Sequence, residues 1–268
     1  RNLCLDIRPG ECLALVGESG SGKSVTAHSI LQLLPEGDAQ TSGSIRYRGQ
    51  ELVGTDPKVL RELRGNRIAM IFQEPMSSLN PLHTIERQLG ESLALHKGLA
   101  GAAARQRIVQ LLELVGIQRP RERLKAYPHQ LSGGQRQRVM IAMALACEPQ
   151  FLIADEPTTA LDVTVQREVL DLLRDLQRDL GTAIILITHD MGVVAEMADE
   201  VAVLKDGRLM QCDTPHEVYE RPADRFDPAA RQRVHKGLFY GVVTGVFIAA
   251  YTVVDGYAVK VALMSPIL

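Results

Sequence analysis

A glycine-rich segment near the start of the chain has the residue types and spacing of a phosphate-binding loop. Gly17–Ser24, GESGSGKS, follows an apolar run and precedes a helical pattern. Its glycines let successive backbone N–H groups turn toward one point, and the positive end of the following helix adds to the field there. In such a loop Lys23 reaches the β- and γ-phosphates of a nucleoside triphosphate, and the Ser24 hydroxyl ligates Mg²⁺. The residues expected to bind the nucleotide are Gly17, Glu18, Ser19, Gly20, Ser21, Gly22, Lys23 and Ser24.

A second segment, Phe151–Glu156, FLIADE, is an apolar run that ends in two carboxylates. We expect Asp155 to face the phosphate loop and to hold Mg²⁺, directly or through water. Glu156 is then placed to polarise the attacking water as a general base. Two adjacent acids after a strand are also found as solvated turn residues, but the phosphate loop upstream favours the catalytic interpretation.

A third segment, Leu131–Arg138, LSGGQRQR, predicts a second helix N-terminus that attracts anions, begun by Ser132, Gly133 and Gly134. The chain has one phosphate loop, so this second helix N-terminus has no obvious ligand within a monomer. We therefore expect a head-to-tail dimer in which Ser132 and Gly134 cover the γ-phosphate held by the other subunit. Asp162 is expected at the same dimer interface. The alternative is an ordinary capping serine followed by turn glycines.

Two more polar residues follow apolar runs. Gln73 comes after RIAMIF, and His189 comes after AIILIT. A lone residue of this kind is usually a surface or capping residue, but in open α/β sheets the strand ends converge on one crevice. There the Gln73 amide can order water and Mg²⁺, and His189 can donate to the γ-phosphate.

The elements that must position these residues alternate along the chain. Strands alternating with helices argue for an α/β domain with a largely parallel central sheet. The stretch 84–147 has helical patterns alone and is expected to form an inserted all-helical lobe. Strands are expected over residues 11–16, 43–48, 67–72, 151–154, 183–187, 201–204 and 208–211, and helices over 24–34, 56–64, 84–116 (broken at 98–101), 135–147, 163–180 and 191–198.

Composition narrows the possible partners. The chain has 268 residues, of which 46% are hydrophobic and 23% charged, and a formal net charge of −2. This balance gives no broad electrostatic reason to bind nucleic acid. The four cysteines are scattered, which favours reduced thiols in a cytosolic domain over a zinc site or a disulfide framework. No signal peptide is recognisable at the start.

The motifs together resemble the ATP-binding domain of ABC transporters. GESGSGKS, Gln73, LSGGQ, LIADEP, ALD and ITHD occur in the order and spacing of that family, from Asn2 to about Pro222. The resemblance implies a P-loop NTPase fold over residues 1–225, with an antiparallel β edge, that binds ATP and Mg²⁺. It assigns catalytic roles to Glu156, Gln73 and His189, metal contacts to Ser24, Gln73 and Asp155, and contacts to the partner's ATP to Ser132, Gly133, Gly134, Gln135 and Asp162.

Two longer stretches, Ile71–Ile85 and Tyr127–Leu145, look like the dipeptide, oligopeptide and nickel importer branch, in particular the first half of its double-domain members. The resemblance implies a second ABC ATPase domain as partner, in a homodimer or a heterodimer. It further implies a membrane permease whose coupling helix meets Gln73 and the helical lobe, and indirectly a solute-binding protein. The location would be peripheral, on the cytoplasmic face of the inner membrane. The alternatives are a soluble, non-transport ABC ATPase and an inactive chimeric fragment.

Both ends depart from the family pattern. The family stacks adenine on an aromatic residue upstream of the first strands, and no aromatic residue precedes Gly10. We expect a short N-terminal stretch to be missing, and ATP binding to be weaker by the loss of a stacking contact of about 0.5–1.5 kcal/mol.

The tail, residues 226–268, is atypical. Gly237–Val254 holds 18 uncharged residues, about 27 Å as a helix, just short of a hydrocarbon core. Arg231, Arg233 and Lys236 precede it and predict a cytoplasmic N-terminal side. The segment looks like one helix of the EamA-type drug/metabolite transporters, which predicts a membrane helix behind a fusion junction near residues 223–230. The alternative is a buried core or docking helix.

Overall fold

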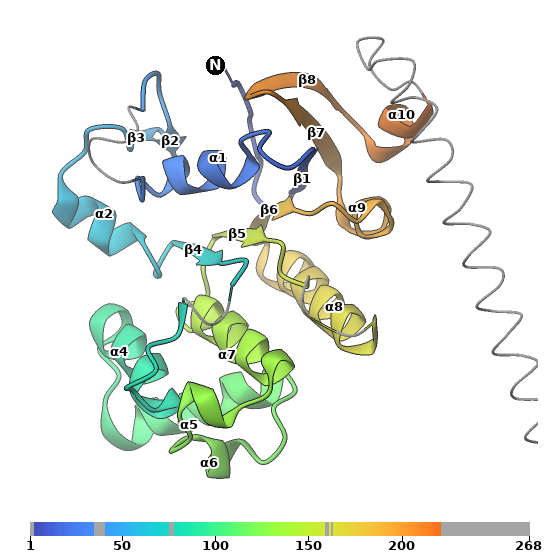
Figure 1. Cartoon of the computed structure of the whole chain (residues 1–268). Coiled ribbons are helices and arrows are strands. Elements are labelled where there is room, and N and C mark those ends of the chain that lie inside the picture. Colours follow the sequence, from blue (N-terminus) through green and yellow to red (C-terminus); the bar gives the residue numbers. More distant parts are fainter. Residues whose placement is uncertain (1–2, 35–40, 75–77, 159–160, 162, 221–268) are drawn as a thin grey trace, which may run out of the picture. The chain divides into compact units, whose positions relative to one another are not determined.

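The computed structural model describes residues 3–34, 41–74, 78–158, 161 and 163–220, all within one structural unit, Arg1–Arg221. A six-stranded sheet of order β4-β5-β6-β1-β7-β8 forms its centre (Figure 1). Neighbouring strands from β4 to β7 run parallel, and β8 lies antiparallel to β7 at the edge. The predicted parallel sheet with an antiparallel edge is thereby confirmed. The strands are β1 Cys12–Gly17, β4 Ile68–Ile71, β5 Phe151–Asp155, β6 Ala183–Ile187, β7 Glu200–Lys205 and β8 Arg208–Asp213.

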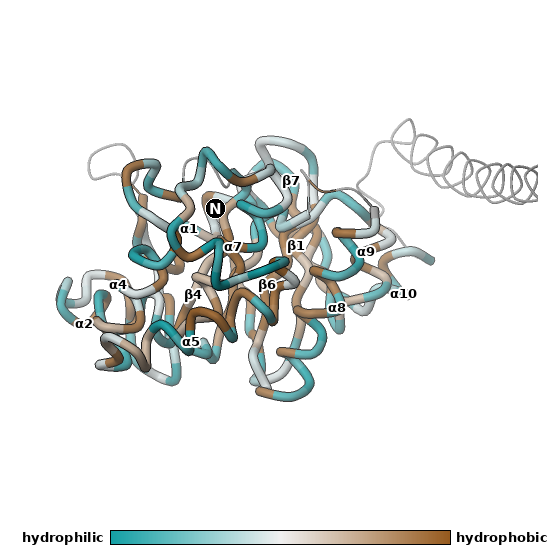
Figure 2. The backbone as a smooth tube through the Cα atoms, turned by 90° about the horizontal axis from the view of Figure 1, so that it is seen from below, coloured by the Kyte–Doolittle hydropathy of each residue, from teal (hydrophilic) through white to brown (hydrophobic). Residues whose placement is uncertain are grey.

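Strands β1, β4 and β6 are apolar on both faces, as β5 is up to Asp155, because helices cover both faces of the sheet. Successive residues of a strand point to opposite faces, and the apolar core divides in that way. Leu152 and Ala154 belong to one buried cluster, whereas Ile153 between them belongs to the other. Figure 2 shows the apolar colouring concentrated around β1, β4 and β6 and the peripheral loops mostly hydrophilic.

Each face has its own helices. Helix α1, Lys23–Ile30, packs on one face through Ala27. Helices α8, Val163–Leu180, and α9, Met191–Met197, contribute to the cluster on the other face. The predicted helix 24–34 is wrong at its end, because the chain leaves the helix at Leu31 and Gln32 has a left-handed φ of 51°. Helix α2, Pro57–Leu63, confirms the helix expected over 56–64. Helix α10, Pro215–Glu220, was not indicated by the sequence patterns.

The expected strand 43–48 is instead a short hairpin. β2, Arg46–Tyr47, pairs with β3, Gln50–Glu51, in a separate two-stranded sheet. Arg48 and Gly49 form the turn with φ of 51° and 81°, the left-handed pair that a two-residue hairpin requires. The turn residues therefore shorten the strand and fold it back.

The stretch 84–147 is helical, as predicted. Figure 1 shows α4, α5 and α6 gathered around α7 on one side of the strands. The lobe does not have a core of its own, because α7 residues share a single buried cluster with both α4 and the sheet. The elements are α4 Ile85–Lys97, α5 Gly101–Leu114, α6 Pro120–Arg123, the 3₁₀ turn η1 Pro128–Gln130, and α7 Gly133–Leu145.

Among the described residues, no helix combines the length and apolar character needed to cross a membrane. The candidate span 237–254 and the junction near 223–230 lie outside those residues, as does Asp162.

Candidate functional site

The glycine-rich loop turns sharply between β1 and α1, and two of its glycines are required by the backbone. Gly20 and Gly22 have left-handed φ of 80° and 99°. At Gly17 an added Cβ would lie 2.2 Å from the Leu204 carbonyl oxygen, so that a larger residue would push β7 away. Gly22 caps α1 without a side chain, so no capping side chain competes with an anion for the first N–H groups of the helix.

The Lys23 side chain folds back over this loop. It is buried, and its Nζ donates to the carbonyl oxygens of Gly17 at 2.9 Å and Glu18 at 3.0 Å. An ammonium group has three donors, so this geometry is compatible with a phosphate oxygen as a further acceptor. The loop is therefore held around a positive charge, and the contact of Lys23 with phosphate stays a prediction.

Asp155 ends β5 beside the start of α1. Its side chain is buried, and burial raises the pKa of this carboxyl above its ordinary value. A hydrogen bond from Ser24 lowers the pKa, and the charge of Glu156 raises it. Its Oδ1 is buried and has no hydrogen-bond partner in the described part of the chain. A hydroxyl next to an unpartnered carboxylate oxygen is a donor set that suits Mg²⁺.

Glu156 is the point where three strand ends meet. Gln73 Nε2 donates to Glu156 Oε2 at 3.0 Å, and His189 Nδ1 lies 3.5 Å from Glu156 Oε1. The three residues follow β4, β5 and β6, which are adjacent and parallel, so the sheet itself brings them together. Glu156 has a left-handed φ of 46°, a conformation that costs a residue with a side chain on the order of 1–3 kcal/mol. Such strain is typical of functional sites.

The Ser132–Gln135 turn forms a separate group. Ser132 caps α7, because its Oγ accepts from the Gln135 N–H at 3.3 Å and its own N–H donates to Gln135 Oε1 at 3.1 Å. Ser132 and Gly133 are exposed. Within the described residues, this turn has no hydrogen bond to the phosphate loop of its own chain. The structure thus divides the predicted site residues into one assembled cluster and one outward-facing turn.

Gly134 in this turn adjoins the segment after β5. A Cβ at Gly134 would lie 3.6 Å from Leu161 Cδ2, an ordinary contact distance. Leu161 immediately precedes Asp162, whose own placement lies outside the described residues.

Sequence reasoning missed Gln137, which is buried in the first turns of α7. Its Nε2 donates to the Pro157 carbonyl oxygen at 2.6 Å, directly after Glu156. The second glutamine of LSGGQRQR was the available signal, because a polar residue at a buried helix position needs a partner.

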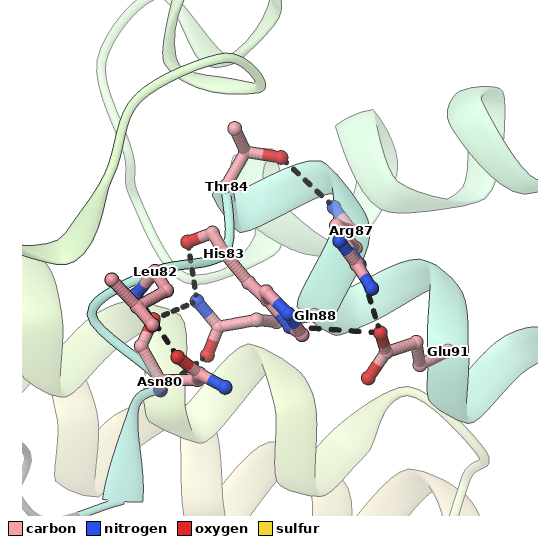
Figure 3. A network of polar contacts seen from close by, with 7 residues as sticks. All are labelled: Asn80, Leu82, His83, Thr84, Arg87, Gln88 and Glu91. Atoms are coloured by element: carbon pink, nitrogen blue, oxygen red, sulfur yellow. Dashed lines mark hydrogen bonds and ion pairs between the residues drawn. The ribbon is translucent and has the colours of Figure 1, made fainter.

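A second missed amide is Gln88 in α4 (Figure 3). Its Nε2 donates to the carbonyl oxygens of Asn80 at 3.1 Å and His83 at 2.9 Å, and its Oε1 accepts from the Asn80 N–H at 2.9 Å. This one buried side chain fixes the turn that joins the Gln73 segment to the lobe. Leu82, at the tip of the turn, is 80% exposed.

Comparisons with known proteins place this geometry in a family. The ABC transporter family model matches residues 1–159. A peptidoglycan transport ATP-binding protein of Agrobacterium fabrum is 58% identical over 222 residues, which are 82% of this chain and 41% of that protein. A dipeptide transport ATP-binding protein of Bacillus subtilis is 51% identical over 83% of this chain and 67% of its own length. The chain therefore spans about two fifths of the first relative and two thirds of the second.

A solved structure of a dimeric ATP-binding cassette, bound to ADP and Pi after hydrolysis, superposes with a TM-score of 0.73 at 31% identity. The match covers 80% of this chain and 90% of that one. The names of the relatives confirm the predicted resemblance to ATP-binding proteins of peptide transporters. From the matched family model, the two-thirds coverage of a close relative and the shared fold, it follows that this chain belongs to the ABC transporter family.

Proposed function

We propose that this chain binds and hydrolyses ATP as the ATP-binding subunit of an importer for peptides or similar small solutes. The observation that carries the proposal is the convergence of Gln73 and His189 on the Glu156 carboxylate, next to the buried Asp155. That arrangement places a base, an amide donor and an imidazole at the strand ends beyond a phosphate loop. ABC relatives with peptide-transport names support the choice of solute class.

In this proposal the phosphate loop and Lys23 hold the β- and γ-phosphates through their N–H groups. The Glu156 carboxylate accepts a proton as water attacks the γ-phosphorus and the bond to the β-γ bridging oxygen breaks, which gives ADP and phosphate. Gln73 fixes one oxygen of that carboxylate and His189 lies by the other, so the carboxylate is oriented before substrate binds.

Ser24 and Asp155 would hold Mg²⁺, with Gln73 as a further ligand. The bound ion would neutralise charge on the phosphate oxygens during transfer. The unpartnered, buried Oδ1 of Asp155 supports this assignment, because a carboxylate oxygen withdrawn from water needs a cation or a donor.

The second part of the proposal is a head-to-tail pair of ATPase domains. Ser132, Gly134 and Gln135 of one domain would cover the γ-phosphate of the other, with Asp162 at the same seam. The exposure of the Ser132 turn and the dimeric state named for the related cassette support it. The ATPase domain would extend over residues 1–225, and the tail 226–268 would carry a membrane helix at 237–254.

The third part concerns the membrane. A permease would dock at the cytoplasmic face of the membrane, against the turn that presents Leu82 and the neighbouring helical lobe, while a solute-binding protein acts on the permease. An exposed leucine on a turn fixed by the Gln88 amide supplies a firm apolar contact there.

The test is phosphate release by the full chain and by its Glu156→Gln variant. We expect the variant to bind ATP like the parent and to release phosphate about 10²–10⁴-fold more slowly, the range for loss of a general base. Glu113→Gln, at an exposed site on α5, is the matched control and should keep the parent rate. Parent-like hydrolysis by Glu156→Gln would rule out the assigned base.

A further inference from the structure

Three consecutive side chains at the end of the LSGGQRQR segment reach three different parts of the chain. Each donates to a backbone carbonyl oxygen. The three acceptors lie in η1, in the segment after Glu156 and at the end of α5. The bonds are Arg136 Nε to Pro128 at 2.8 Å, Gln137 Nε2 to Pro157 at 2.6 Å, and Arg138 Nη1 to Val115 at 2.6 Å.

Gln137 differs from its two neighbours in burial. It is 2% exposed, and its Oε1 is buried without a hydrogen-bond partner in the described part of the chain. An amide oxygen withdrawn from water in this way is destabilising, and an apolar side chain of the same size would fill the space without that cost. Packing alone therefore does not explain a glutamine at this position, whereas a required bond to Pro157 does.

The acceptor is well placed to control Glu156. Proline has no N–H group, so its carbonyl oxygen is the backbone hydrogen-bonding group through which Pro157 can be fixed. The preceding Glu156 is in the left-handed region, and its N–H donates to the Ile187 carbonyl oxygen at 2.9 Å. Glu156 is thus held from β6 on its N-terminal side, and the next residue, Pro157, is held from α7 by Gln137 through its carbonyl oxygen.

Gln137 is also rigidly connected to Ser132 through the first turns of α7. Gln137 lies five residues after that cap, roughly 7.5 Å along a continuous helix at 1.5 Å per residue. A shift of the start of α7 therefore moves the Gln137 amide with it. No other element needs to move for the shift to reach Pro157.

We propose that Gln137 is a positioning residue that couples the two ATP sites of the dimer. Contact between Ser132 and the partner's nucleotide sets the position of α7, and Gln137 transmits that position to Pro157 and so to the Glu156 carboxylate of its own site. This inference rests on the proposed function, since it requires both ATP hydrolysis and a dimer.

The test uses Gln137→Met in the full chain, which keeps the size of the side chain and removes its donor. We expect ATP binding and thermal stability close to those of the parent, kcat lower by roughly tenfold, and a Hill coefficient for ATP that falls to about 1. Gln110→Met, the same change at an exposed site on α5, should leave all of these at the parent values.

A double-variant cycle separates coupling from a local defect. If Ser132 acts through Gln137, Ser132→Ala should lower kcat much less in the Gln137→Met background than in the parent. Gln137→Leu, which also has no donor at the end of its side chain, should reproduce the kinetics of Gln137→Met. A Gln137→Met variant with parental kcat and Hill coefficient, or additive effects in the cycle, would overturn the inference alone. A parent without ATP turnover would overturn the proposed function as well.

Discussion

Helices α1 and α7 both begin at glycine-rich turns, yet they differ in how the N–H groups of their first turns are capped. α1 is capped by Gly22, which has no side chain, and its first residue, Lys23, is buried against the loop. α7 is capped by Ser132, whose side chain and that of Gln135 already satisfy two backbone N–H groups, and the turn faces solvent. An uncapped N-terminus with a buried cation can bind an anion unaided.

The self-capped N-terminus of α7 needs a second surface. Two of its N–H groups already have side-chain partners, and its first residue is Gly133, where α1 has Lys23. The comparison supports the proposed function, in which the first turn binds a nucleotide by itself and the second turn gains a ligand when another domain brings its nucleotide.

Among the changes that distinguish the two turns, the largest effect is expected at Lys23. Lys23→Ala removes the charge that the loop encloses, and ATP hydrolysis should fall by about 10²–10³-fold, the usual loss for a donor that stabilises developing charge. Phosphate release by the full chain measures this. Lys97→Ala at the end of α4 is the control and should retain the parent rate. Equal losses in both variants would show that the loss does not depend on the charge inside the first turn.

The same substitution in the two turns should have opposite consequences. Gly17→Ala brings a Cβ against the Leu204 carbonyl oxygen and should lower the free energy of unfolding by about 1–3 kcal/mol. Gly134→Ala meets Leu161 at an ordinary distance, so its stability should be unchanged or up to about 1 kcal/mol higher.

Gly134→Ala should nevertheless impair ATP-dependent dimerisation, because the backbone of this turn would approach the partner's phosphate. Chemical denaturation and sedimentation of both variants check the pair of outcomes. A destabilised Gly134→Ala variant would mean that the turn is structural.

Ser132 provides a smaller contrast. Ser132→Ala removes the cap of α7, and Thr84→Ala removes the cap of α4, in which Thr84 Oγ1 accepts from the Arg87 N–H at 3.3 Å. Each should lower the free energy of unfolding by about 1 kcal/mol. Dimerisation with ATP should weaken in Ser132→Ala alone, and a matching loss in Thr84→Ala would trace the effect to helix stability.

The smallest effect concerns pH. The pKa of Asp155 is raised on folding, so between its unfolded value, near 4, and the raised value the native state binds more protons than the unfolded state. The Asp155 contribution to stability therefore falls as pH rises through that window. Asp155→Asn should be more stable than the parent at pH 7 without Mg²⁺, and the difference should shrink as pH falls toward 4. Denaturation curves at several pH values measure it, and a pH-independent difference would contradict the assigned charge.

The features that could be predicted from the sequence are those that depend on local residue patterns. The Gly17–Ser24 spacing identifies its own turn, and apolar runs define β4, β5 and β6, whose parallel order is enough to bring Gln73, Glu156 and His189 together. Adjacent strands in a parallel sheet have their carboxyl ends at one edge, which is why polar residues at those ends could be expected to meet.

Long-range pairings could not be predicted in the same way. Gln137 and its acceptor Pro157 are 20 residues apart in the chain, and the helical pattern does not indicate which carbonyl oxygen accepts the hydrogen bond from Gln137. The left-handed φ of Glu156 and the hairpin turn at Arg48 are set by tertiary contacts and turn geometry that outweigh residue propensity.

The most direct test of the account is the mass of the full-length Glu156→Gln variant, by sedimentation velocity with and without ATP and Mg²⁺. We expect a monomer without nucleotide and a dimer with it, because binding persists while turnover stops. Adding Ser132→Arg, which blocks the outward-facing turn but leaves the phosphate loop intact, should keep the protein monomeric with ATP still bound. A monomer under all conditions, or a dimer that forms regardless of ATP or of Ser132→Arg, would contradict the claim that the Ser132 turn of one domain closes over the nucleotide held by the other.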